Sequence, residues 1–146
     1  MIGLARLGRR LARDRTASMA VEFALLAPIF LTLFIGLFQV SVYLQNYNAV
    51  RSLASDAVRV VTVEYQKNNT LTPGQIESIM LGMALNPPYL LKTDQITIDV
   101  AEEATSRVNG AKEFEVDITY AEQDWLPFVD LPDLTLNYSR PIFVVS

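Results

Sequence analysis

The amino-acid sequence predicts an α+β protein: a long N-terminal transmembrane stem helix packed on a small head with one short helix and a three-stranded antiparallel sheet. Three observations support this fold class. Residues 23–44 form an apolar run without a charged side chain, residues 45–66 show helical periodicity, and much of the remainder alternates between apolar and polar side chains. These patterns are typical of a membrane span, an amphipathic helix and half-buried strands, respectively.

The apolar run predicts a transmembrane helix with a defined orientation. As a helix it extends about 33 Å, which exceeds the ~30 Å hydrocarbon core of a bilayer. Five arginines precede the run, whereas residues 47–146 contain seven basic and fourteen acidic side chains. The positive-inside rule therefore places the N-terminus in the cytoplasm and the acidic part outside. The arginines are Arg6, Arg9, Arg10, Arg13 and Arg15.

A cleaved export signal or a nucleic-acid-binding arm fits this N-terminal segment less well than a membrane span. A secretory signal peptide has an apolar core of only about 7–15 residues and a small-residue cleavage pattern, which is missing after residue 44. A twin-arginine export signal would rest on Arg9 and Arg10 alone. A basic arm by itself suggests nucleic acid, but beside a span the positive-inside rule explains it, so we expect no nucleic-acid partner.

The helix is expected to continue beyond the membrane to residue 66 and to end at the "KNNT" sequence of residues 67–70. Asp56 and Arg59 are three residues apart and are predicted to pair on the outer face of this helix. Its apolar side chains recur at the i, i+3, i+4 and i+7 spacing of an amphipathic helix. They are Val50, Leu53, Ala54, Ala57, Val58, Val61 and Tyr65.

A second, short helix is predicted after this break. Thr72 is a typical N-cap residue, Pro73 fits the first helical position and Gln75 completes a capping box. Pro87 and Pro88 cannot continue a helix, so the helix should end near residue 86. Its predicted apolar stripe consists of Ile76, Ile79, Met80 and Met83.

Three antiparallel strands are predicted in the C-terminal part, because even-numbered positions are apolar from residue 96 to 100, from 114 to 120 and from 134 to 144, apart from Arg140. Pro141 lacks an N–H, which places the third strand at an edge or at a bulge. A two-residue turn at Asn109-Gly110 would pair even-numbered residues of one strand with odd-numbered residues of the other. Core side chains would then lie opposite solvent-facing side chains. The first hairpin therefore needs partners whose numbers have an even sum, through a bulge or a longer loop.

These elements divide the chain into a basic leader (1–17), a transmembrane and stem helix (18–66) and an extracytoplasmic α+β head (67–146). The chain has no cysteine and no histidine. Thiol nucleophiles, disulfides, cysteine or histidine metal sites and a histidine base are therefore excluded. Carboxylate chemistry stays open, but we expect no enzymatic activity, no catalytic residues, no cofactor and no metal.

A carboxylate, Glu22, stands directly before the apolar run, where it could reach the membrane interface at little cost. A cut between Ala17 and Ser18 would make Glu22 the fifth residue of a mature chain, at the head of the apolar helix. In this respect "RDRTASMAVEFALLAPIFLTLFIGLFQ" resembles type IV pilins and, more closely, the TadE-like pseudopilins or minor pilins of the tight-adherence (Tad) pilus system. The stretch "NAVRSLASDAVRV" and the ending "VDITY…WLPFVDLPDLTLNYSRPI" resemble parts of the same family.

The resemblance implies that a prepilin peptidase cleaves between Ala17 and Ser18. Glycine is usual before the cut in this family, and Ala17 is the least bulky alternative. The new α-amine of Ser18 would be cationic at neutral pH. The resemblance implies that Glu22 pairs with this amine in a neighbouring subunit, which relieves the cost of a carboxylate in lipid, about 2.5–3.5 kcal/mol at the bilayer centre.

Three further features of the sequence have both structural and functional interpretations. Pro28 within the span is either a tolerated membrane proline or a functional helix kink. Trp125 and Phe128 lie in a proline-rich loop, where they either form a satellite core or bind a partner at an interface. The acidic side chains Glu102, Glu103, Glu113, Glu115 and Asp117 lack the spacing of an EF-hand, so a solvated outer strand face is favoured over a calcium site.

The leading hypothesis is therefore a structural minor pilin or pseudopilin of a Tad-type pilus. Its implied partners are other pilins or pseudopilins of the same pilus, the prepilin peptidase, the inner-membrane pilus assembly platform and the lipid bilayer. Its expected location is the bacterial inner membrane as a single-pass protein, with incorporation into the pilus as a further option. The alternative is a membrane-tethered extracytoplasmic binding or enzymatic module with an uncleaved anchor, in which Glu22 would be dispensable.

Overall fold

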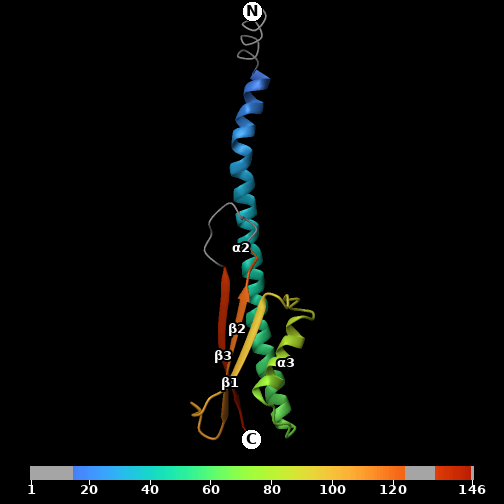
Figure 1. Cartoon of the computed structure of the whole chain (residues 1–146), viewed down its shortest axis with the longest axis vertical. Coiled ribbons are helices and arrows are strands. Elements are labelled where there is room, and N and C mark those ends of the chain that lie inside the picture. The colour runs from blue at the N-terminus through green and yellow to red at the C-terminus, as the bar shows by residue number, and fades with distance from the viewer. Residues whose placement is uncertain (1–14, 124–133, 146) are drawn as a thin grey trace, which may run out of the picture. The chain divides into compact units, whose positions relative to one another are not determined.

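The computed structural model describes residues 15–123 and 134–145, with side chains from residue 18 onward. Residues 1–39 and 40–146 form two compact units, which are considered separately below. Within the described residues, two helices and three strands follow one another along the chain (Figure 1). They are α2 (Arg15–Gln66), α3 (Pro73–Ala84), β1 (Ile96–Glu102), β2 (Lys112–Ala121) and β3 (Thr135–Val144). The predicted α+β fold class is confirmed.

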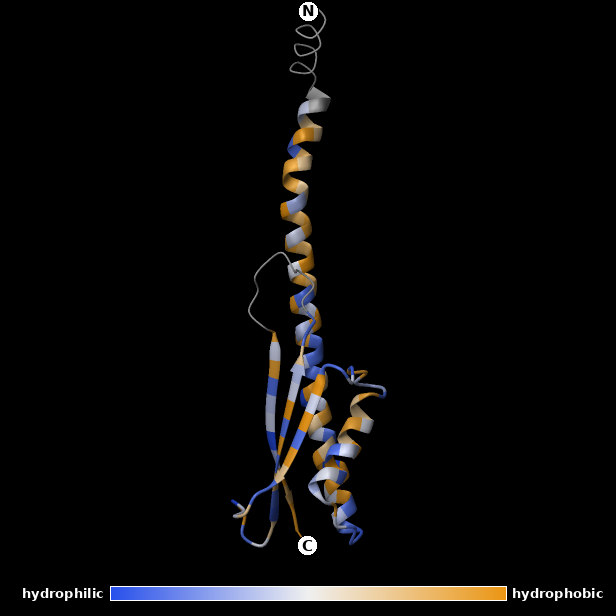
Figure 2. Cartoon of the chain, viewed as in Figure 1, coloured by the Kyte–Doolittle hydropathy of each residue, from blue (hydrophilic) through white to orange (hydrophobic). Residues whose placement is uncertain are grey.

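Helix α2 continues from the apolar run into the head without interruption and ends at Gln66, as the sequence predicts. Figure 2 shows the change from a mostly hydrophobic segment to a mixed one along this helix. The part of α2 within residues 40–146 buries one stripe in the core of the head, while Val58 from the same predicted stripe is half-buried. The buried members are Val50, Leu53, Ala54, Ala57, Val61 and Tyr65.

Helix α3 begins where the sequence predicts and ends at Ala84, just before the predicted boundary. The predicted capping box is present, and in it the backbone N–H of Thr72 donates to Oε1 of Gln75 at 2.9 Å. The Thr72 hydroxyl also donates to this oxygen, at 3.2 Å. The buried face of α3 consists of Ile76, Met80 and Ala84, whereas the predicted Ile79 and Met83 are half-buried.

The three strands form one antiparallel sheet in the order β1-β2-β3. Ile98 lies opposite Ile118 in the first hairpin, so its partner numbers have an even sum and the register prediction is confirmed. Residues 103–111 connect the two strands as a longer loop rather than a two-residue turn. Gly110 in this loop has a φ of +80°, a conformation in which a side chain would be strained.

All buried apolar sheet residues are even-numbered, and they share one core with the buried stripes of α2 and α3. Both helices therefore cover the same face of the sheet, and the odd-numbered side chains point to the opposite face. Figure 1 shows α3 beside β1, and the backbone N–H of Val100 on that edge donates to a carboxylate oxygen of Glu77 at 3.0 Å. Helix α3 thus provides a hydrogen-bond acceptor for a backbone N–H at the β1 edge of the sheet.

Strand β3 forms the other edge, as the sequence predicts from Pro141. The backbone N–H of Glu122 donates to the carbonyl oxygen of Leu134, the residue directly opposite, at 3.0 Å. The backbone polar groups of Leu134 therefore point toward the β2 side. Along an edge strand, residues whose backbone N–H and C=O groups point toward the neighbouring strand alternate with residues whose groups point away from it. Pro141, an odd-numbered residue, therefore occupies an outward-directed position, where its missing N–H costs the ladder no hydrogen bond.

One predicted local contact is wrong. Asp56 and Arg59 form no ion pair, although both belong to the described part of the chain. Asp56 instead accepts a short hydrogen bond from the hydroxyl of Tyr89, which follows α3. The reason is that Tyr89 provides a partner fixed by tertiary packing, whereas an exposed pair three residues apart on a helix contributes only a few tenths of a kcal/mol.

Candidate functional site

The N-terminal half of α2 has an unburied apolar surface. Within the described residues, fourteen of the nineteen exposed large apolar side chains belong to residues 19–44. Phe23 and Leu25, for example, are 71% and 70% exposed. A continuous apolar surface of this kind marks a contact with lipid or with other proteins. In the described part of the chain, α2 is the one helix that is long and apolar enough to cross a membrane.

Glu22 lies at the start of this apolar surface and is exposed. Ser18 is one helical turn earlier, and its hydroxyl donates to Oε1 of Glu22 at 3.4 Å, a long contact. Among the side chains that the structure describes, which start at residue 18, no cation forms an ion pair with this carboxylate. Residue 17, before the predicted cut, lies in the first turns of α2. The helix therefore brings Ser18 and Glu22 to one face.

Pro28 lies inside α2, and the helix continues on both sides of it. The Thr32 hydroxyl donates to the carbonyl oxygen of Pro28 at 2.8 Å. Hydroxyl bonds of this type to the preceding turn often bend helices, and Pro28 also removes one backbone donor. The functional role of a kink at Pro28 stays a prediction.

The two aromatic side chains predicted at an interface, Trp125 and Phe128, lie outside the described residues. The leader arginines Arg6, Arg9, Arg10 and Arg13 also lie outside them.

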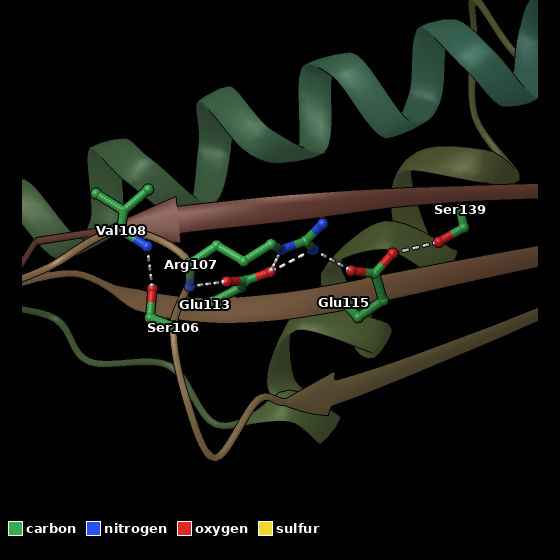
Figure 3. A network of polar contacts seen from close by, with 6 residues as sticks. All are labelled: Ser106, Arg107, Val108, Glu113, Glu115 and Ser139. Atoms are coloured by element: carbon green, nitrogen blue, oxygen red, sulfur yellow. Dashed lines mark hydrogen bonds and ion pairs between the residues drawn. The ribbon is translucent and has the colours of Figure 1, made fainter.

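A polar network holds the loop of residues 103–111 against the outer sheet face (Figure 3). The backbone N–H of Arg107 donates to Oε2 of Glu113 at 2.7 Å, and its guanidinium makes a short contact with the same carboxylate. The guanidinium also reaches Oε2 of Glu115 at 2.8 Å, and Ser139 donates to this second carboxylate. Hydrogen bonds from Arg107 lower the pKa of Glu113 below its ordinary value of 4.5.

Two of the acidic side chains that were predicted to lie on a solvated strand face are therefore not fully exposed. Glu113 is buried, with 1% of its side chain exposed, and Glu115 is half-buried. The basic residue that covers Glu113 comes from a loop without periodicity, which is why the strand pattern alone missed the contact. No group of three or more acidic side chains in the described residues is arranged to hold a metal ion.

A groove of about 750 Å³ lies between the C-terminal part of α2 and α3. Asp56 and Arg59 line it from α2, Met83 from α3, and Tyr89 from the segment after α3. Partial burial, followed by the hydrogen bond to Asp56, raises the pKa of Tyr89 to about 12. The Tyr89–Asp56 contact therefore ties the segment after α3 to α2 at one side of the groove.

These features define a class: an α+β protein whose long apolar N-terminal helix fits a membrane anchor and continues into a small, acidic head. Comparison with known families is consistent with this class, because residues 17–59 match the model of the TadE-like protein family. The resemblance of the N-terminal sequence to this family is thereby confirmed over residues 17–59. No curated protein and no solved structure matches the chain.

Proposed function

We propose that this chain is a minor pilin or pseudopilin of a Tad-type pilus, and that it acts as a structural subunit without catalysing a reaction. The observation that carries the proposal is the position of Glu22 at the head of an exposed apolar helix, within the segment that matches the TadE-like family. Among the side chains described from residue 18 onward, no cation forms an ion pair with this carboxylate, and a neighbouring subunit would supply one.

The proposed pathway begins with insertion of α2 into the inner membrane, with residues 1–17 in the cytoplasm and the head outside. A prepilin peptidase then cuts between Ala17 and Ser18 and creates a cationic amine on Ser18. The stem packs with the stems of other pilins at the assembly platform, and Glu22 of one subunit neutralises the amine of another. This pairing removes the cost of an isolated charge in an apolar environment.

Intact-mass measurement of the membrane-extracted chain tests the cut. The proposal predicts a mass that lacks residues 1–17 in cells with an active prepilin peptidase, and the full mass when the peptidase is inactivated. A chain that keeps its leader in both cells would contradict processing and would favour an ordinary membrane-tethered module.

Substitution of Glu22 tests the pairing. Glu22→Gln should leave insertion and head folding intact, because the head core contains no residue near position 22, while co-purification with partner pilins falls roughly tenfold or more. Glu103→Gln, at an exposed carboxylate of the head, is the matched control and should assemble normally. If cleaved Glu22→Gln protein assembles as well as the control, the pairing mechanism is wrong.

Cysteine labelling tests the orientation, and the absence of native cysteine makes each label specific. A membrane-impermeant maleimide should react with Asn109→Cys in the exposed loop of the head before the inner membrane is lysed. Ala5→Cys in an uncleaved chain should react only after lysis. The reverse order of reactivity would refute the proposed topology.

A further inference from the structure

Several cations of the head form no ion pair with a carboxylate of the described residues. Seven basic side chains occur after residue 46, and all belong to the described part of the chain. Lys67, Arg107 and Lys112 form ion pairs with glutamates. Within the described residues no ion pair involves the remaining four, which are Arg51, Arg59, Lys92 and Arg140. Four cations without an ion pair are unexpected here, because the described residues after position 46 also include eleven acidic side chains.

Two of these four cations lie one turn before and one turn after Ser55 on α2, and a third contacts Ser55 from β3. Arg51 precedes Ser55 by one helical turn and Arg59 follows it by one turn, so the three residues share a helix face. Arg140 approaches from β3, and its Nη1 donates to the Ser55 hydroxyl oxygen at 2.7 Å. Arg51, Arg59 and Arg140 are called the stem arginine cluster. Arg51 and Ser55 also line a polar depression of about 390 Å³, together with Asn48, Ser52 and Asp56.

The opposite side of the head carries unpaired acids. Asp99 of β1 and Asp117 of β2 are directly opposed partners in the sheet, and both are exposed. They occupy odd positions, which point away from α2 and α3. Directly opposed like charges destabilise an antiparallel pair, and no described cation forms an ion pair with either aspartate. Glu115 on the same face is already held by Arg107 and Ser139.

We propose that the outer sheet face of one copy, through Asp99 and Asp117, docks on the stem arginine cluster of the next copy. The chain itself carries both complementary surfaces, on opposite sides of the packed layer of helices and sheet, which favours a second copy as the occupant. Guanidinium–carboxylate contacts combine charge with paired hydrogen bonds, and docking removes the repulsion between the two aspartates.

The proposed contact joins two different surfaces, so it is heterologous and repeats from copy to copy instead of closing as a two-fold dimer. It concerns contacts between heads and does not depend on cleavage or on Glu22. It therefore goes beyond the proposed function, and the two can fail separately.

Disulfide trapping between full-length chains in a lipid-free, non-ionic detergent tests the contact. Ser52→Cys places a thiol beside the arginine cluster, and Thr97→Cys places one beside Asp99 on the outer face. Both positions are exposed, and neither side chain forms a hydrogen bond within the described part of the chain. When the two single-cysteine chains are mixed at low salt and oxidised, the mixed 52–97 product should exceed both symmetric products at least about threefold, because the contact is heterologous.

Charge reversal identifies the groups that make the contact. In the Ser52→Cys chain, Arg51→Glu with Arg59→Glu should lower the mixed product about fivefold or more. Asp99→Lys with Asp117→Lys in the Thr97→Cys chain should have the same effect, because each reversal opposes like charges. Mixing the two reversed chains restores opposite charges, so the yield should return to within about twofold of the original. This rescue also shows that the reversed chains are folded.

Matched controls separate a specific contact from the effect of net charge. Lys67→Glu with Lys92→Glu, and Asp94→Lys with Glu103→Lys, change the charge by the same amounts outside the two surfaces. They should change the yield less than about twofold. Symmetric products equal to the mixed one, reversals that leave the yield unchanged, or controls as harmful as the reversals would each overturn the proposal. No trapping of the mixed product in the lipid-free detergent would also overturn it.

Discussion

Removal of one buried side chain of the stem tests whether α2 forms part of the head core. Leu53 is fully buried on the stripe of α2 that packs in the core. Leu53→Ala should destabilise the head by about 2–5 kcal/mol, which combines the lost transfer free energy with the cavity left behind. Because about 1.4 kcal/mol corresponds to a factor of ten in an equilibrium constant, the population of the unfolded head should rise roughly 30-fold or more.

Hydrogen exchange of the full-length chain in detergent measures this change at the backbone amides of the head. Amides of β2, the central strand, should exchange through unfolding of the head, so their exchange should accelerate by the same factor. Leu44→Ala is the matched control on the same helix, since 53% of Leu44 is exposed and it does not belong to the core. Its effect on β2 should stay below about threefold, as for an ordinary surface substitution.

The outcome that would refute this reasoning is specific. If Leu53→Ala left exchange in β2 unchanged while altering only amides of α2, the sheet and α3 would fold without the stem. The buried stripe of α2 would then lie against the head without forming part of its core.

Three further expectations follow from two side-chain contacts and from one backbone conformation. Arg107 lowers the pKa of Glu113, so the contact stabilises the head above the ordinary carboxyl pKa of 4.5 and is lost as pH falls through the lowered value. Glu113→Gln should therefore destabilise the head at pH 7, and denaturant titrations should show that this difference shrinks as pH falls through the lowered pKa of Glu113. Tyr89 should ionise near pH 12 in ultraviolet difference spectra, and Tyr89→Phe should remove that step; because its pKa is raised, the stability from its protonated form is present below pH 10 and lost as pH rises through about 12. Gly110→Ala should cost about 1 kcal/mol in thermal unfolding because of its positive φ, whereas Gly74→Ala, in α3 with open space around it, should not destabilise the head.

Sequence periodicity by itself determined most of the architecture. Helical spacing identified the buried stripe from Val50 to Tyr65, because side chains three and four residues apart share a helix face. The even parity of the apolar strand positions determined the register of β1 and β2, since a slip by one residue would reverse the faces. Local chemistry was equally informative: Thr72 and Pro73 marked the start of α3, and Pro141 marked an edge strand. The proximity of Ser18 and Glu22 likewise follows from their spacing of four residues.

Only the tertiary structure decided which polar groups meet across the head. Arg140 donates to Ser55, 85 positions earlier in the chain, and Tyr89 reaches Asp56 over 33 positions. Glu113 is covered by Arg107 from an irregular loop, although its strand position suggested solvent. A periodic pattern specifies the face on which a side chain lies, but it carries no information about the path of a loop or about the neighbouring element. Contacts between elements depend on packing angles and loop geometry, which arise when the whole core assembles.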